Sequence, residues 1–102
     1  MSAKRPRVSR RLAERAAKKL VQDKEKLALL SPGGSRDRPM VVTSSAVIEP
    51  RAMAMPCIQC GGQYRVREHE APASRLRRVD VTCQQCSAPR TLWFRISPDD
   101  PN

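Results

Sequence analysis

Apolar residues between Val8 and Leu30 recur every three or four positions, which is the spacing of one face of an α-helix. Ser9 is a suitable N-cap residue, and Ser31-Pro32-Gly33-Gly34 is a clear stop, because proline and glycine interrupt helices. The apolar stripe is narrow and rich in alanine, so most of the helix surface is polar. The pattern therefore predicts a helical extension over residues 1–30.

The pattern changes in the second half, where apolar and polar residues alternate as they do in strands with one buried face. Three stretches behave in this way, at residues 63–70, 75–83 and 90–96. The last of them places Leu92, Phe94 and Ile96 on one face. Ala71-Pro72-Ala73-Ser74 has the composition of a hairpin connection. We expect three antiparallel strands within residues 55–97.

Residues 31–54, between the helix and these strands, have a weaker pattern. Residues 31–39 have the composition of a linker, whereas residues 40–48 contain valines that favour a short strand and a Thr-Ser-Ser run that interrupts it. Residues 50–56 are expected to be extended, with Met53 and Met55 covering a small core. The basic residues 1–7 and the tail at residues 98–102 are expected to be disordered.

Four cysteines, Cys57, Cys60, Cys83 and Cys86, form two C-x-x-C pairs, and the chain has no other cysteine. Each pair fits a short turn, and four thiolates complete the tetrahedral set that Zn²⁺ takes at structural sites. Glycines follow the first pair, and glycine readily adopts the positive φ that such a turn needs. Ser87 follows the second pair, which is a departure from this pattern.

These two turns and three strands resemble the zinc-ribbon family, in which two zinc knuckles are carried on a three-stranded antiparallel sheet. The resemblance covers about residues 55–97. It implies one Zn²⁺ per chain held by all four cysteines, and it implies no particular activity. The fold class expected is thus a small metal-stabilised β domain preceded by a basic helix and a linker. Such a small core depends on its metal, which can contribute about 10 kcal/mol to folding.

Two other uses of the cysteines are open. Two C-x-x-C turns also suit iron in a rubredoxin-like site, although such sites usually lie under a larger aromatic core than one Trp, one Tyr and one Phe provide. A dithiol redox site needs only one C-x-x-C and is usually found in a βαβ context, which this pattern does not predict. The N-terminus has no apolar signal-peptide core. We therefore expect a cytoplasmic location and no disulfides.

The chain is strongly basic, with a formal net charge of +10. Four thiolates and one dication would add −2 and leave about +8. Residues 1–30 carry ten Lys and Arg against three acids, and residues 56–96 carry seven Arg against three acids. This balance favours polyanionic partners, because they release counterions on binding.

The predicted helix is a candidate phosphate-binding element. Its cations Arg10, Arg11, Arg15, Lys18 and Lys19 are the expected contacts. Two other interpretations are open: a solvated extension that keeps a small protein soluble, or a helix that binds a protein partner through residues 9–30. A targeting peptide is disfavoured by the acids at positions 14, 23 and 25.

Strand alternation predicts a second basic surface on one face of the sheet. It would consist of Arg65, Arg67, Arg77, Trp93 and Arg95, with Trp93 available to stack on an unpaired base. The alternative is a solvated face whose Trp93 packs under the N-terminal region.

The sequence contains little that supports catalysis. His69 is the only histidine, it falls on an expected exposed strand position, and four thiolates leave a metal no open coordination position. We therefore expect a non-enzymatic zinc-ribbon protein with no small-molecule substrate and no membrane partner. It would bind nucleic acid or dock on a nucleic-acid-containing assembly. The alternative is a protein–protein adaptor with purely structural zinc, and a redox role is a third hypothesis.

Overall fold

The computed structural model describes residues 7–97. The disorder expected at residues 1–7 and 98–102 therefore falls outside the part described, except at Arg7, where it is wrong because Arg7 begins the first helix. In chain order the elements are α1 (Arg7–Leu30), β1 (Met40–Val42), the short 3₁₀ helix η1 (Ser45–Val47), α2 (Ile48–Ala54), β2 (Tyr64–Ala73), β3 (Leu76–Cys83) and β4 (Pro89–Ile96).

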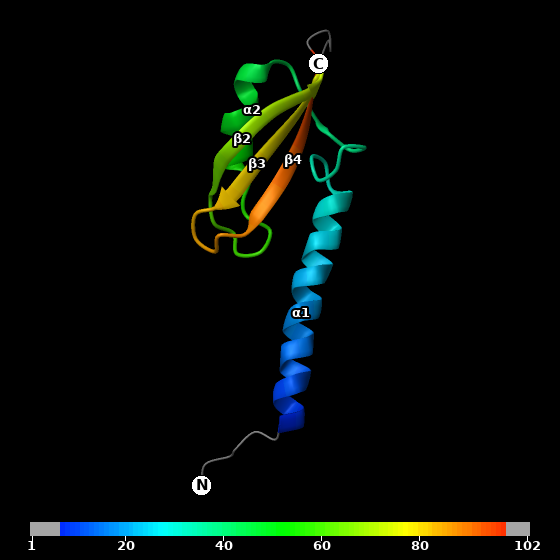
Figure 1. Ribbon diagram of the computed structural model, residues 1–102, viewed down its shortest axis with the longest axis vertical. Coiled ribbons are helices and arrows are strands. Elements are labelled where there is room, and N and C mark those ends of the chain that lie inside the picture. The colour runs from blue at the N-terminus through cyan, green and yellow to red at the C-terminus, as the bar shows by residue number, and fades with distance from the viewer. Residues whose placement is uncertain (1–6, 98–102) are drawn as a thin grey trace.

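The molecule is elongated because α1 projects from a small β domain (Figure 1). Its extents are 68 × 24 × 24 Å and its radius of gyration is 18.0 Å, against about 13 Å for a compact chain of this length. The 24 residues of α1 span about 36 Å. The C-terminal end of α1 lies beside the sheet, and its N-terminal part extends well beyond the sheet (Figure 1).

The sheet has four strands in the order β1-β4-β3-β2, so the expectation of three strands was incomplete. β2, β3 and β4 are antiparallel neighbours, as the alternation predicted. The fourth strand, β1, runs parallel to β4, with Met40 opposite Phe94 and Val42 opposite Ile96. It comes from the ambiguous segment at residues 40–48. Three residues are too few to establish an alternating period, and the partner that makes them a strand lies far along the chain.

A short helix, α2, replaces the extended segment expected at residues 50–56. Its two buried residues, Ile48 and Ala52, are four positions apart and therefore lie on one face. Pro50 lies in the first turn, where its missing N–H has no intrahelical partner to lose. Met55 packs on the core as expected, but Met53 is exposed, because it lies on the outer side of α2.

The core lies between α2 and one face of the sheet. Tyr64, Phe94, Ile48, Val79 and Val81 are its largest fully buried side chains besides Cys83. Leu92 and Phe94 are buried and Ile96 is half-buried, which confirms the alternation predicted for this strand. The core therefore reaches the cysteines at one end of the sheet.

The β2–β3 hairpin differs from the expected one in two ways. The strands continue through the segment expected as a loop, and a turn at Ser74 and Arg75 joins them. The register also shifts between Val66 and Glu68, which leaves Arg67 as an extra residue in β2. A bulge of this kind changes which side chains share a face beyond it. It therefore changes the composition of the outer face of the sheet.

Candidate metal centre and basic surfaces

The two C-x-x-C turns, here called the first knuckle (residues 57–62) and the second knuckle (residues 83–88), have the same backbone design. In the first, the N–H of Gly61 donates to the carbonyl of Cys57 at 2.7 Å. In the second, the N–H of Ser87 donates to the carbonyl of Cys83 at 3.0 Å. Gly61 has φ +78° and Ser87 has φ +63°. Ser87 thus adopts the left-handed conformation that glycine adopts at the equivalent position.

The knuckles bring the four sulfurs together. All four Sγ atoms lie within 4.8 Å of one another, with 3.7 Å between Cys57 and Cys86 and 3.4 Å between Cys60 and Cys83. Four sulfurs at about 2.3 Å from one Zn²⁺ would be about 3.8 Å apart in a tetrahedron. Disulfide sulfurs are only about 2.05 Å apart, so the cysteines are free thiols. The cluster can hold a single metal ion.

Gly62 allows this close approach. A Cβ atom at Gly62 would lie 2.9 Å from the Sγ of Cys83 and 3.0 Å from the side-chain oxygen of Gln85. The backbone of the first knuckle can therefore pack against the second knuckle only because this residue has no side chain. Such a cradle fits a four-sulfur metal site.

Backbone N–H groups donate hydrogen bonds to three of the four sulfurs. The N–H of Gln59 donates to the Sγ of Cys57, and the N–H of Gly62 donates to the Sγ of Cys60, both at 3.4 Å. In the second knuckle, the N–H groups of Gln85 and Cys86 both donate to the Sγ of Cys83, also at 3.4 Å. This arrangement suits ligands that must be deprotonated to bind a cation.

The thiol pKa values reflect these contacts. The N–H of Cys86, followed by that of Gln85, lowers the pKa of Cys83 to about 6 against the opposing effect of burial. Burial raises the pKa of Cys57, but N–H groups of Cys60 and Gln59 bring it below the ordinary thiol value. The N–H of Ala88 lowers the pKa of Cys86, yet the neighbouring sulfurs and desolvation together raise it to about 12. Four thiolates this close therefore need a cation to coexist.

The metal centre is buried on one side only. Cys57 and Cys83 are buried, whereas Cys60 and Cys86 are exposed. Tyr64 lies under the first knuckle, where its hydroxyl accepts a 3.4 Å hydrogen bond from the N–H of Ile58. Burial raises the pKa of Tyr64, so it remains a neutral part of the core.

The C-terminal part of α1 docks on the first knuckle. Gln59, between two of the cysteines, donates through its side-chain amide to Glu25 at 2.9 Å and to the carbonyl of Val21 at 3.4 Å. Lys24 donates to the carbonyl of Gln59 at 3.3 Å. No local sequence pattern singled out Gln59 or Glu25, because their role depends on where the helix ends relative to the sheet.

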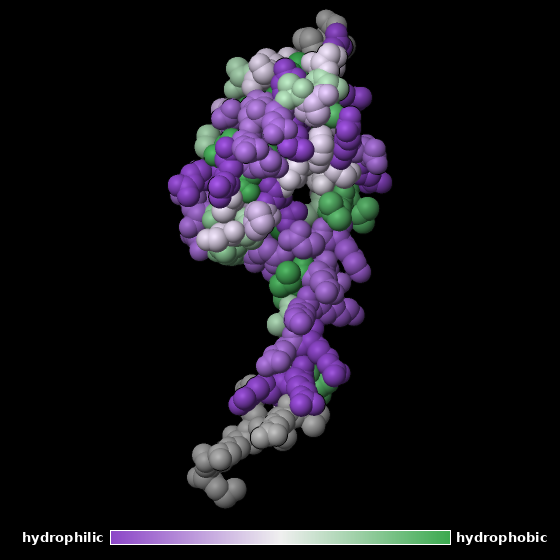
Figure 2. Space-filling model, in the orientation of Figure 1, coloured by the Kyte–Doolittle hydropathy of each residue, from purple (hydrophilic) through white to green (hydrophobic). Residues whose placement is uncertain are grey.

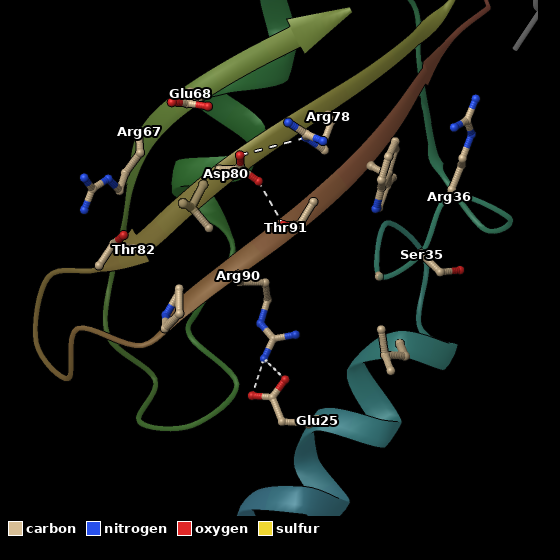
Figure 3. A pocket seen from close by; sticks show the side chains of 15 residues that line it. Glu25, Ser35, Arg36, Arg67, Glu68, Arg78, Asp80, Thr82, Arg90 and Thr91 are labelled. Carbon is tan, nitrogen blue, oxygen red and sulfur yellow. Dashed lines mark hydrogen bonds and ion pairs between the residues drawn. The ribbon is translucent and has the colours of Figure 1, made fainter. Parts of the chain in front are cut away.

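The helix also contacts β4. Arg90 donates to both carboxylate oxygens of Glu25 at 2.7 Å, as Figure 3 shows. Burial raises the pKa of Glu25, but the hydrogen bonds from Gln59 and Arg90 lower it below its usual value overall. Ala28 is buried, and the N–H of Trp93 donates to the carbonyl of Gly33 at 2.8 Å. The segment expected to be a linker is thus held against β4.

The N-terminal part of α1 is free of the β domain. Every residue from 9 to 20 is exposed, and hydrophilic residues cover most of the visible side of this part of α1 in Figure 2. The five cations expected to contact phosphate lie here, with Glu14 as the one acid. Arg11, Arg15 and Lys18 are spaced by four and three residues, so they lie on one helix face.

The outer face of the sheet, which is the face turned away from α2, differs from the basic surface that the sequence predicted. Arg65, Trp93 and Arg95 do share the outer face, and Arg67 lies at the bulge beside it. Arg77 was wrongly placed there: it stands directly opposite Phe94, whose side chain is in the core, so it belongs to the other face. Its guanidinium donates to the carbonyl of Leu76 at 3.2 Å.

The outer face also carries three carboxylates near its centre. Glu68 stands opposite Asp80, and Glu70 stands opposite Arg78, which donates to it at 2.6 Å. Asp80 accepts a 2.8 Å hydrogen bond from Thr91. A groove of about 1000 Å³ lies between this face and the end of α1, lined by both acids and arginines (Figure 3). The face is therefore of mixed charge rather than basic.

Trp93 is half-buried at one wall of this groove. The guanidinium of Arg36, from the segment after α1, lies 5.9 Å from the centre of its ring. This is within the range of a cation–π contact. Trp93 is thus partly covered by Arg36, which comes from the segment expected to be a linker.

His69, given no role by the sequence, lies 3.0 Å from a carboxylate oxygen of Glu49. This contact joins β2 to α2, and His69 is remote from the metal centre in the register of β2.

Comparison with known proteins adds no family. No protein-family model matches the chain, and neither a curated protein nor a solved structure matches it significantly. Among residues 7–97, no helix combines the length and apolar character needed to cross a bilayer. The four-cysteine cluster is compatible with a zinc-ribbon-like motif.

Proposed function

We propose that this chain is a small non-enzymatic protein that binds nucleic acid, or a nucleic-acid-containing assembly, through α1. The observation that carries the proposal is the free N-terminal part of α1, because residues 9–20 contain five exposed cations and only one acidic residue. A helix that extends about 20 Å beyond its last contacts can reach phosphates without steric interference from the β domain. Such contacts fix position but carry little sequence information.

In this proposal the four cysteines hold one Zn²⁺ with a purely structural role, in a reducing cytoplasmic compartment. Zinc suits four thiolates in a closed tetrahedral set, and such a site leaves no position for a substrate. The core supports this assignment, because Tyr64 and Phe94 are its only aromatic residues, and Trp93 lies on the outer face. A core of this size gains much of its stability from a bound ion.

The outer face of the sheet takes a smaller part than its arginines suggest. Glu68, Glu70 and Asp80 lie among them, and Arg78 is already paired with Glu70. Arg36 covers part of Trp93. Base stacking on Trp93 therefore requires Arg36 to move, whereas α1 is accessible as it stands.

Fluorescence anisotropy with single- and double-stranded oligonucleotides across a salt series tests the proposal. Each duplex phosphate contact contributes about 0.9 to the slope of log affinity against log salt. The triple variant Arg11→Ala, Arg15→Ala, Lys18→Ala should therefore reduce the slope by about 2.7. The matched control, Arg65→Ala, Arg67→Ala, Arg95→Ala, should reduce it by less than one unit. Absence of binding at low salt contradicts the proposal.

The second candidate is a protein–protein adaptor, favoured by the apolar residues that α1 leaves exposed. Leu12, Leu20 and Leu27 are 58%, 56% and 66% exposed, so no part of residues 7–97 covers them. Apolar docking does not weaken steeply with salt. A partner retained at high salt and lost on Leu12→Ser, Leu20→Ser would favour the adaptor.

A further inference from the structure

We propose that the metal centre controls the direction of α1 through Gln59, so that metal occupancy regulates how the basic helix is presented. The inference deepens the proposed function, because the regulated element is the proposed binding helix. It concerns the orientation of α1 relative to the sheet, which is measurable without any nucleic acid.

The contacts of α1 converge on a residue held by the metal site. Gln59 makes three hydrogen bonds to α1: to Glu25, to the carbonyl of Val21, and from Lys24. Its own N–H donates to the Sγ of Cys57. Gln59 is therefore fixed on one side by a metal ligand and on the other by the helix.

The position of Gln59 depends on the first knuckle being closed. The knuckle contains two consecutive glycines, Gly61 and Gly62, and glycine has the largest conformational freedom to lose on ordering. Without a cation the four free thiols have no common ligand partner that holds the two knuckles together. Loss of the ion should thus open the knuckle and remove the contacts of Val21, Lys24 and Glu25 with Gln59 together.

The remaining attachments of α1 are close to its end. Leu30 is held by Arg38, which donates to its carbonyl at 3.1 Å, and Gly33 pairs with Trp93. Ala28 and the Glu25–Arg90 pair lie within two turns of the same end. With the first knuckle open, α1 should stay tethered at residues 25–33 but lose its fixed direction.

The second knuckle provides a matched control. Gln85 occupies the same position in Cys83-Gln84-Gln85-Cys86 that Gln59 occupies in the first knuckle, and its N–H likewise donates to a cysteine sulfur. Gln85 is exposed and makes no hydrogen bond to α1 among the described residues. Gln59→Ala and Gln85→Ala therefore change equivalent positions, and only the first removes contacts with the helix.

The test is ¹⁵N relaxation and residual dipolar couplings of the full-length chain, with zinc and after chelation in the presence of reductant. In the zinc-loaded wild type, amides of α1 and of β2–β4 should fit one alignment tensor. Gln59→Ala should keep one zinc per chain and dispersed sheet resonances, while α1 no longer fits that tensor. Gln85→Ala should behave as wild type, and chelated wild type should retain helical shifts in α1 without the shared tensor.

The proposal is overturned if α1 in zinc-loaded Gln59→Ala, or in the chelated wild type, keeps the tensor of the sheet. If Gln59→Ala loses its zinc, the double variant Lys24→Ala, Glu25→Ala removes the Lys24 and Glu25 contacts with Gln59 from the helix side. It also removes the Glu25–Arg90 pair, so Arg90→Ala is its control, and the same criterion applies. Because no oligonucleotide is present, failure here leaves the salt-dependence test of nucleic-acid binding standing. Failure of that test likewise leaves the orientation result intact.

Discussion

Glu25 and Arg90 are 65 residues apart in the sequence, yet one guanidinium nitrogen of Arg90 donates to both carboxylate oxygens of Glu25 at 2.7 Å. The Arg90 side chain is 8% exposed and that of Glu25 is 45% exposed. The solvent exposure of this pair is therefore intermediate between that of a surface ion pair and that of a buried one. It joins the proposed binding helix to the strand that follows the second knuckle.

Charge reversal at this pair should release α1. Glu25→Arg leaves Arg90 with a like charge beside it, and we expect the free energy of unfolding of the zinc-loaded chain to fall by about 2 kcal/mol, between the values of exposed and buried pairs. The double variant Glu25→Arg, Arg90→Glu should recover part of this loss. Urea denaturation of the two single variants and the double variant measures the coupling. If the loss in the double variant equals the sum of the losses in the two single variants, the two residues do not interact directly.

The purified chain should contain one zinc ion per molecule bound by Cys57, Cys60, Cys83 and Cys86. The reason is the clustering of four sulfurs within 4.8 Å of one another. Elemental analysis gives the identity and the stoichiometry, and cobalt substitution should give the visible absorption of a tetrahedral thiolate site. Iron in the native protein, or a folded and reduced chain without metal, would refute the assignment.

Cys60→Ser should unfold the β domain, because the small core would lose an ion that can contribute about 10 kcal/mol. The helical circular dichroism of α1 should largely remain, although its docking on the first knuckle should be lost with the knuckle. Proton–nitrogen correlation spectra will show the loss of dispersed sheet resonances. If those resonances persist, another interaction is the main source of stability.

The two knuckles should respond in opposite ways to changes at their left-handed positions. Ser87→Gly should stabilise the chain by about 0.5–1 kcal/mol, since glycine adopts a φ of +63° without steric cost. Gly61→Ala should destabilise it by about 1 kcal/mol for the reverse reason. Nothing lies within 4 Å of a Cβ at Gly61, so backbone conformation alone is responsible. Urea midpoints of both variants check the signs.

Gly62→Ala should act on metal binding rather than on backbone conformation. The added Cβ would lie 2.9 Å from the Sγ of Cys83, so the first knuckle must shift away from the second. We expect zinc affinity to fall by about tenfold or more, measured by competition with a chromophoric chelator. Gly61→Ala is the control, and an equal loss of affinity in both variants would contradict a steric origin.

Local patterns were enough to predict much of this fold. The helical period predicted α1, the alternation predicted β2, β3 and β4, and the paired C-x-x-C spacing predicted a metal-binding cluster. These signals are strong because each depends on neighbouring residues along the chain. The burial of Leu92 and Phe94 follows from the same alternation.

The errors come from features that depend on distant residues. β1 is a strand only because Phe94–Ile96 lie beside it, and α2 has seven residues, including a proline, that pack on a core not visible locally. The bulge at Arg67 brought Glu68 and Glu70 to the outer face, where simple alternation had predicted only arginines and Trp93. Arg77 was misplaced because its strand was counted without reference to its partner Phe94.

The projecting geometry of α1 has a mechanical consequence. About fourteen residues of the helix, some 21 Å, extend beyond Val21, the first residue with a contact to the knuckle. A pivot of about 10° at the docked end would displace the far tip by about 4 Å, close to the rise of about 3.4 Å per base pair along a DNA duplex. A shift of the first knuckle that tilts α1 would thus move the far tip of the helix further than the knuckle itself moves.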